Sequence, residues 1–331
     1  MRRLFGLGLL VFLVACRSVP MPVGAAQGPG AMAADAFVTA DDVQLRLHVW
    51  APDADPRAVV LALHGFNDHG GSFAAIAEAF TDAGVALYAF DQRGFGESEH
   101  AGLWPGKDVL AGDARLALDL LRTRYPHIPL YLLGKSMGGA VAMLLMADEH
   151  PPELAGTLLL APAVVGETVM PGHQRVALWL AERLVPGLPL SVELGQALGY
   201  RPSDQEEVMA ALRDDPLVLD HPRVEAVAGL AELMHAALVA APAVTGEVLL
   251  LYGSRDDLVP GQAICKLLGS LGDSDERGDW RVRHYPDGFH MLTRYSGAAT
   301  TRADLLDWIT GAGGDGLLEP EEAMRELECR R

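Results

Sequence analysis

One serine in the sequence lies between two glycines, with an apolar run on either side. It is the middle residue of Gly134-Lys135-Ser136-Met137-Gly138, within the stretch YLLGKSMGGAVAML. Glycines at these places permit a turn too tight for a Cβ, which would expose the serine hydroxyl at the end of a strand. The pattern GxSxG is common by chance, so the strand and helix around it make Ser136 a candidate nucleophile.

A serine hydroxyl is a weak nucleophile, so it needs a base, and the base needs an acid to orient it. The stretch LLLYGSRDD ends on Asp256 and Asp257, and the stretch VRHYPDGFH ends on His290. Both follow strand-like runs, in the chain order serine, acid, histidine. Asp287 is a third acid candidate, but it is a poor one because it belongs to the loop of His290 itself.

The hydrophobic pattern predicts a scaffold that brings these residues together. Continuous apolar runs, typical of strands buried on both faces, occur at AVVLALHG, VALYAFD, PLYLLG and LAGTLLLAP. Stretches with helical spacing separate them, such as SFAAIAEAFTDAG. A repeated order of strand and helix predicts an α/β fold, with a parallel sheet covered by helices on both faces.

The alternation stops after Pro162 and returns at EVLLLYGSRDD. The stretch between is too long for a plain loop and contains apolar helical segments, so we expect a helical cap at 163–241. The core then comprises 35–162 and 242–311. The last stretch, 312–331, is expected to be a polar tail that frays, although EPEEAMRELECRR could form a short helix.

The N-terminus, MRRLFGLGLLVFLVACRSVP, has two arginines and then about a dozen apolar residues, too few to span a bilayer permanently. The run ends on Cys16 and resembles a bacterial lipobox, which predicts a signal peptide at 1–15 and a lipid on Cys16. The alternative is a plain signal peptide with a chance cysteine. A flexible tether is expected at 16–34. Arg17 stands where an aspartate would favour the inner membrane, so we expect a cell-envelope location with a weak preference for the outer membrane.

The net charge of −18 makes nucleic acid an improbable partner, because phosphate binding needs a basic surface. Beyond Cys16 only Cys265 and Cys329 remain. Since Cys329 lies in the polar tail, no structural disulfide is expected between them. No CxxC or HExxH pattern suggests a metal site.

Taken together, five motifs resemble the monoacylglycerol lipase and lysophospholipase branch of the α/β-hydrolases, which is also grouped with serine aminopeptidases. They are LHGFNDHGGSF, FDQRGFGES, LLGKSMGGAVAM, LYGSRDDLVP and YPDGFHML. They extend from Leu61 to His290 and are jointly specific. The resemblance implies an eight-stranded, mostly parallel sheet with helices on both faces and a helical cap inserted after strand 6 of that family.

The resemblance also implies roles for individual residues. Ser136 would be the nucleophile, Asp256 the acid and His290 the base. The backbone N–H groups of Phe66 and Met137 would form the oxyanion hole. No cofactor is implied.

Three positions next to residues with an expected role are interpreted separately: Asp257, Lys135 and His64. The Gly-x-x-Asp acid motif of the family matches Asp256 better than Asp257. Lys135 stands where many relatives have histidine, and we interpret it as a local variation that leaves the triad intact. His64 is expected to support the oxyanion loop rather than to act as a base.

The cap is expected to decide the class of substrate. In this fold it covers the serine and forms an apolar tunnel for an acyl chain, which Val176, Leu178, Leu180 and Leu184 would suit. Amphipathic cap helices could instead contact a membrane surface, or they could simply pack on the core. The sequence does not separate these alternatives.

The expected activity is hydrolysis of carboxylic esters through an acyl-enzyme, most simply of monoacylglycerol or lysophospholipid. A peptidase or an acyltransferase would use the same three residues, so both stay open. A non-catalytic binding protein is a further alternative, although no member of the triad is missing. Head group, acyl-chain length and oligomeric state are not indicated by the sequence.

Overall fold

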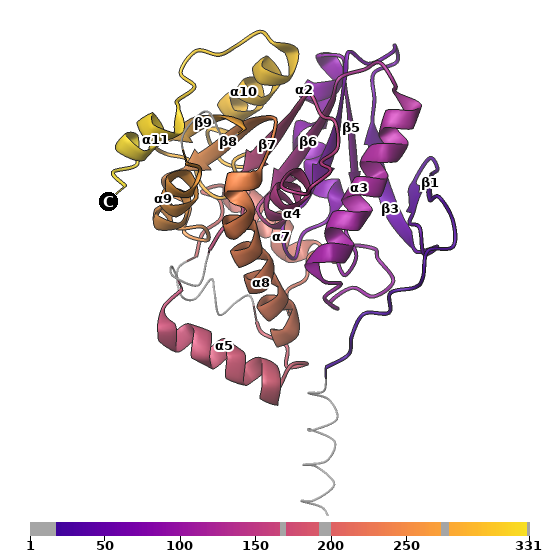
Figure 1. Ribbon diagram of the computed structural model, residues 1–331, viewed down its shortest axis with the longest axis vertical. Helices are drawn as coiled ribbons and strands as arrows, with labels where there is room; N and C mark the ends of the chain where they lie inside the picture. Colours follow the sequence, from indigo (N-terminus) through magenta and orange to yellow (C-terminus); the bar gives the residue numbers. More distant parts are fainter. Residues whose placement is uncertain (1–17, 166–169, 192–199, 273–277, 330–331) are drawn as a thin grey trace, which may run out of the picture.

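A computed structural model describes residues 18–165, 170–191, 200–272 and 278–329. The predicted signal peptide and Cys16 lie outside these residues. Nine strands form one sheet in the order β1-β2-β3-β5-β4-β6-β7-β8-β9 (Figure 1). The strands are β1 (Ala31–Met32), β2 (Ala36–Val38), β3 (Gln44–Trp50), β4 (Ala58–Leu63), β5 (Val85–Phe90), β6 (Leu130–Lys135), β7 (Gly156–Leu160), β8 (Glu247–Gly253) and β9 (Asp279–Tyr285).

In the order of the sheet, the strands from β1 through β3 to β5 pair antiparallel, and those from β5 to β9 pair parallel. Every residue of β4, β5 and β7 is buried, which agrees with their continuous apolar sequences. The sheet has one strand more than expected. The two short strands β1 and β2 are the ones that hydrophobic alternation could not indicate, because two or three residues contain too few repeats.

Helices cover both faces of the sheet, and each face has its own hydrophobic core. One core contains side chains of α3, α4, α8, α9 and α11, and the other contains side chains of α2 and α10. The helices are α2 (Ala74–Asp82), α3 (Lys107–Arg124), α4 (Met137–Met146), α5 (Gly172–Leu184), α7 (Glu206–Asp214), α8 (Val224–Ala240), α9 (Gly261–Ser270), α10 (Ala298–Thr310) and α11 (Pro320–Glu326).

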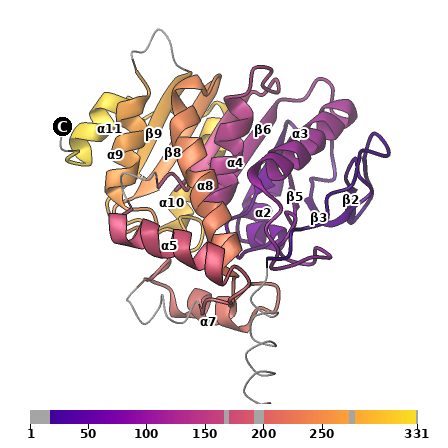
Figure 2. The same ribbon diagram turned by 60° about the horizontal axis from the view of Figure 1, so that its bottom comes forward.

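Within the described residues of the predicted cap, the helices α5, α7 and α8 come between β7 and β8. Figure 2 shows α5 and α7 beyond one end of the sheet, while α8 runs back along α4 toward β8. Helix α8 with the following turn is long and apolar enough to cross a membrane by length and composition alone. Its packing against α4 gives those apolar residues a partner within the protein.

The segment before β2 is not the flexible tether that its composition suggested, at least from Ser18 onward. Met21 is buried against the turn at Gly94. Gln27 donates a backbone hydrogen bond of 2.6 Å to Ala40, and β1 then pairs with β2. Glycine and proline composition indicated a linker, but it could not reveal that the core offers partners for this backbone.

The C-terminal segment also differs from the expectation. Leu318 exchanges backbone hydrogen bonds with Val282 of β9, and α11 buries Ala323 against the core. Cys329 forms a disulfide with Cys265 of α9, with Cα atoms 5.5 Å apart. The prediction of a frayed tail without a disulfide is therefore wrong. The tail contains a short helix whose apolar side packs on the core, while its polar residues lie on the outer side.

Candidate active site

Ser136 lies at the tight turn between β6 and α4. Its φ is 51°, in the left-handed region that a residue with a side chain adopts only when its surroundings enforce it. The turn leaves no space for a side chain at Gly138, where a Cβ would lie 2.1 Å from the carbonyl oxygen of Leu63. Ser136 itself stays partly exposed. The GxSxG spacing thus places one hydroxyl at the carboxyl edge of the sheet.

Asp256 and His290 come from the loops that follow β8 and β9. His290 Nδ1 lies 2.7 Å from Asp256 Oδ2, and both side chains are at least nine-tenths buried. The other carboxylate oxygen accepts N–H groups from Leu258 and Val259 at 2.9 and 2.8 Å. Asp256 is thereby fixed as an acceptor toward Nδ1, which leaves Nε2 of His290 as the nitrogen able to accept a proton.

The other two acid candidates face elsewhere. Asp257 accepts the backbone N–H of Arg201 at 2.7 Å, and Asp287 forms an exposed ion pair with Arg255. The structure therefore brings Asp256, and neither of its two competitors, to His290.

The loop after β4 lies beside the serine. A Cβ on Gly65 would be 3.3 Å from Ser136 Cβ, so the backbone at 65–66 passes close to the nucleophile. Within the described part of the chain, the backbone N–H groups of Phe66 and Met137 donate to no other residue. Two unpaired amides next to a serine can stabilise negative charge on a substrate oxygen.

His64 is held neutral under this loop. Its Nε2 accepts the backbone N–H of Gln92 at 2.9 Å, so Nδ1 must carry the proton that it shares with the carbonyl oxygen of Gly65 at 2.8 Å. Complete burial lowers the pKa of His64 to about 4. With both nitrogens occupied, His64 supports the loop and is not available as a base.

A buried group of charges connects the loop of Phe66, the turn of Ser136 and the loop of His290. Asp68, in the loop of Phe66, pairs with Lys135, the residue before Ser136. Arg294, four residues after His290, approaches the same Asp68 oxygen at 3.3 Å. Burial alone would raise the pKa of Asp68, but the charges of Lys135 and Arg294 hold it well below its usual range. We call Asp68, Lys135 and Arg294 the charge trio.

Asp68 and Arg294 are not among the functional residues that the sequence predicts. A signal was present, since each is a charged residue four positions after a motif histidine, in a loop that follows a buried strand. Sequence spacing could not show that both meet Lys135.

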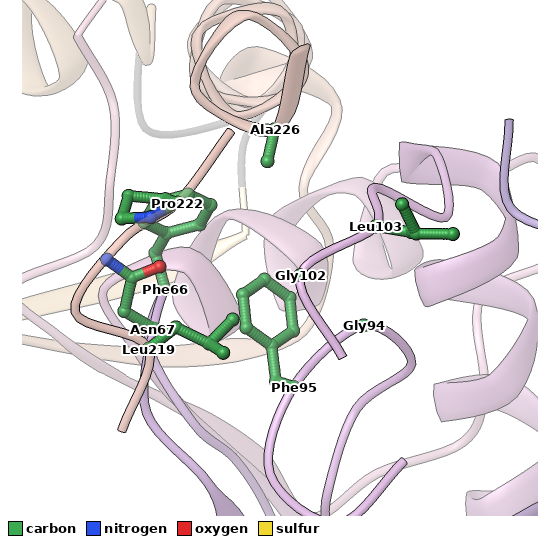
Figure 3. Close-up of a pocket in the computed structure, with 9 residues that line it drawn as sticks. All are labelled: Phe66, Asn67, Gly94, Phe95, Gly102, Leu103, Leu219, Pro222 and Ala226. Carbon is green, nitrogen blue, oxygen red and sulfur yellow. The ribbon is translucent and has the colours of Figure 1, made fainter. Parts of the chain in front are cut away.

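The segment of the cap at 215–219 is hydrogen-bonded to the loop of Phe66. Leu219 donates a backbone hydrogen bond of 3.0 Å to Asn67, and His69 Nε2 lies 3.0 Å from Asp215 Oδ2. A narrow apolar crevice, too tight to hold a water molecule, lies at this junction (Figure 3). It is lined by Phe66, Asn67, Gly94, Phe95, Gly102, Leu103, Leu219, Pro222 and Ala226.

The segment of the cap at 201–202 is hydrogen-bonded to the loops of Asp256 and His290. Arg201 bonds to Asp257 as described, and Met291, next to His290, donates its N–H to the carbonyl oxygen of Pro202 at 2.8 Å. The cap thus contacts the loops that carry Phe66, Asp256 and His290, and its first residue, Ala163, donates its backbone N–H to the carbonyl oxygen of Ser136 at 3.0 Å.

Helix α5 differs from the tunnel lining expected of it. None of its residues is buried, and Val176, Leu180 and Leu184 are 58%, 42% and 69% exposed. These three side chains point away from the protein, so they do not line an enclosed acyl site. Their apolar character could not indicate from the sequence which side of the helix faces inward.

One group of possible metal ligands occurs within the described residues. Suitable atoms of His48, His69 and Asp91 lie within 4.8 Å of one another. Asp91, however, already accepts backbone N–H groups from Gly70 and Glu97 at 2.8 Å, in addition to His48. These bonds explain the cluster as the support of a turn, and we assign no metal to it.

The mostly parallel sheet with helices on both faces is that of an α/β-hydrolase, and Ser136, Asp256 and His290 follow β6, β8 and β9 at one edge of it. The sequence family described as "Serine aminopeptidase, S33" matches residues 54–294, and the chain belongs to this family.

Related proteins include several that are named monoacylglycerol lipase or monoglyceride lipase. Monoacylglycerol lipase of Mycolicibacterium smegmatis is 30% identical over 82% of this chain and 95% of its own length. Monoglyceride lipase of Homo sapiens is 28% identical over 77% of this chain and 82% of its own. Together with the family match, these relatives make the chain an ester hydrolase of the α/β-hydrolase type.

Solved structures agree on the fold. The monoacylglycerol lipase of Paleococcus ferrophilus superimposes with a TM-score of 0.65 at 21% identity, over 81% of this chain and 99% of that one. A soluble variant of the Saccharomyces cerevisiae monoglyceride lipase gives 0.64 at 17% identity, over 90% and 98%.

Proposed function

We propose that the protein hydrolyses carboxylic esters of lipids, with monoacylglycerols and lysophospholipids as the leading substrates, through an acyl-enzyme on Ser136. The observation that carries the proposal is the 2.7 Å contact of His290 with Asp256, on the same sheet edge as the strained turn of Ser136. The names of the relatives support the lipid ester.

In the proposed mechanism His290 Nε2 takes the proton of Ser136 as the hydroxyl attacks the ester carbonyl. The amides of Phe66 and Met137 stabilise the oxyanion, and Asp256 stabilises the imidazolium. His290 then protonates the leaving alcohol. Water, activated by the same nitrogen, releases the fatty acid and restores the serine.

We further propose that Cys16 carries a lipid that holds the enzyme in a bacterial cell envelope, with the outer membrane preferred. The disulfide between Cys265 and Cys329 supports this location, since such bonds persist in oxidising compartments. Mass spectrometry of the mature N-terminus would show a diacylated Cys16, and a mature chain that begins elsewhere would contradict the anchor.

The test of the activity is the variant Ser136→Ala with a panel of monoacylglycerols, lysophospholipids and p-nitrophenyl esters of graded chain length. Turnover should disappear while the thermal unfolding temperature stays unchanged. A fluorophosphonate should label the wild type at Ser136 and leave the variant unlabelled. Turnover by the purified variant would refute the assignment, and absence of labelling in the wild type would favour a binding protein.

The panel also separates the alternative reactions. Aminoacyl p-nitroanilides test a peptidase, and added glycerol tests acyl transfer, because an acyltransferase would form a new ester where a hydrolase releases acid. Faster cleavage of the anilides than of any ester would replace the proposal with a peptidase.

A further inference from the structure

Helix α5 presents four large apolar side chains to solvent. Val176, Trp179, Leu180 and Leu184 are 58%, 51%, 42% and 69% exposed, and we call them the α5 stripe. Their spacing of three and four residues places them on one side of the helix. Isolated apolar residues on a surface are normal, but a continuous stripe of this size indicates a contact surface.

The opposite side of α5 already has its partner. Leu178 and Ala181, about half a turn away from the stripe, are partly buried, and α5 packs against α8. The stripe is therefore not the side of α5 that packs on the rest of the protein. Arg183 places its guanidinium over the ring of Trp179, with the carbon 4.1 Å from the ring centre.

The composition of α5 suits a lipid surface. Tryptophan and arginine are enriched where proteins meet lipid head groups, and the helix combines them with exposed aliphatic side chains. In a chain of net charge −18, α5 has two arginines and one glutamate, a local sum of +1. An anionic surface would thus be repelled less by this helix than by the rest of the protein.

The N-terminal end of the described chain lies at the same place. Ser18, Val19 and Pro20 line an open hollow of about 400 Å³ together with Glu182 of α5. Figures 1 and 2 show the start of the indigo trace beside the end of α5. Only Arg17 separates Ser18 from Cys16, and two residues span at most about 7 Å.

We propose that the α5 stripe lies in the interface of the bilayer that also receives the N-terminal anchor. The proposal rests on the anchor and the lipid-ester activity proposed above, and it gives the enzyme a fixed orientation. The α-carbon of Cys16 can be no further than about 7 Å from that of Ser18, which lines the hollow beside Glu182, so a bilayer that receives a lipid from Cys16 passes close to α5. The cap that contacts the catalytic loops then faces the layer that contains the substrate.

The first test is the full-length double variant Leu180→Glu/Leu184→Glu. Its turnover of monoacylglycerol in phosphatidylcholine vesicles should fall at least about tenfold, because charges on the stripe oppose insertion. Turnover of soluble p-nitrophenyl butyrate should stay within about twofold, since exposed substitutions change little inside the protein. The matched control is Val239→Glu, which changes a residue 66% exposed at the far end of α8 and should leave both rates intact.

Unchanged vesicle turnover in the double variant would overturn the proposal. An equal loss on both substrates would also overturn it, because the stripe would then act through the active site.

The second test does not depend on hydrolysis. In the Ser136→Ala background, vesicles of phosphatidylcholine with brominated acyl chains should quench tryptophan fluorescence, and Trp179→Phe should remove most of that quenching. Quenching without any ester hydrolysis by the parent enzyme would support the surface and refute the proposed function. Absence of a Trp179 contribution would overturn the surface. So would a Trp179 emission that depends on protein concentration without vesicles, since a second copy would then cover the stripe.

Discussion

Asp256 and Asp257 are adjacent in the sequence but have different bonding partners. The first orients His290, and the second accepts a hydrogen bond from Arg201 of the cap. Both residues lie in the turn after β8, where the side chain of Asp256 meets His290 and that of Asp257 meets the cap. The family motif favoured Asp256, and the geometry gives the reason.

The change Asp256→Asn should lower kcat by about 10⁴-fold, because an amide in place of the carboxylate favours the wrong imidazole tautomer. The amide oxygen can still accept the N–H groups of Leu258 and Val259, so the loop should keep its fold. Steady-state kinetics on p-nitrophenyl butyrate measure the effect. Asp257→Asn is the matched control, and a comparable loss there would contradict the assignment of the acid.

The charge trio makes a prediction about stability. Lys135→Met leaves the buried carboxylate of Asp68 with Arg294 alone, which should cost about 3 kcal/mol of unfolding free energy. Adding Asp68→Asn removes the uncompensated charge and should recover a large part of that loss. Urea unfolding of both single variants and the double variant gives the coupling. Strictly additive effects would show that the pair does not interact.

His64 predicts a pH dependence. Its pKa is about 4 in the fold and near 6.5 when unfolded, so between these values the unfolded chain binds a proton that the folded chain refuses. Stability should therefore fall as the pH drops from 6.5 to 4, by up to about 3 kcal/mol from this group.

Urea unfolding at pH 7 and pH 4.5 measures this effect. The low pKa of Asp68 acts with the same sign but at lower pH, since it stabilises the fold above the ordinary carboxyl pKa and is lost only in stronger acid. The variant His64→Gln should show a flatter dependence over this window. An identical slope in that variant would assign the acid sensitivity to other groups.

Among the secondary-structure elements, those with long apolar runs were predictable and those held by distant partners were not. Strands β4 to β8 and helix α4 follow from sequence alone, because each repeats its pattern over at least five residues. A short helix at α11 was one of two expectations for the C-terminal segment, but its packing on the core, and the order of the segment at 18–34, escaped prediction for a different reason. The short or polar sequences of both segments are ordered by contacts with β9, α9 and the turn at Gly94.

The candidate site divides in the same way. Motif order was enough to place Ser136, Asp256 and His290 on one edge of the sheet. The meeting of Asp68 with Arg294, 226 positions apart, depends on the shape of the closed loops and has no local signature.

The disulfide gives a prediction for the C-terminal elements. It closes a separation of 64 residues between α9 and the end of α11, so Cys329→Ser should lower the unfolding free energy by about 2–4 kcal/mol. The fold and the catalytic loops should stay intact at 25 °C. Cys265→Ser and the double variant should cost the same as Cys329→Ser, and a double variant that costs the sum would show that the two thiols are not bonded.

For the whole molecule, the comparisons and the coordinates support one architecture in which the helices of the cap bridge the catalytic loops. The two segments of the cap at 201–202 and 215–219 are hydrogen-bonded to loops that carry candidate catalytic groups. A movement of the cap would therefore shift the loops of Phe66 and His290. The stripe on α5 extends this connection outward. If the α5 stripe contacts a bilayer as proposed, the cap connects that bilayer to the loops of Phe66 and His290.

The order of the strands has a consequence for biosynthesis. Strand β8 occupies the place between β7 and β9, although the whole cap separates it from β7 along the chain. A nascent chain therefore displays its serine long before the acid and the histidine have been made. If Ser136, Asp256 and His290 act together as proposed, the chain cannot hydrolyse esters until the residues that follow β8 and β9 have been made.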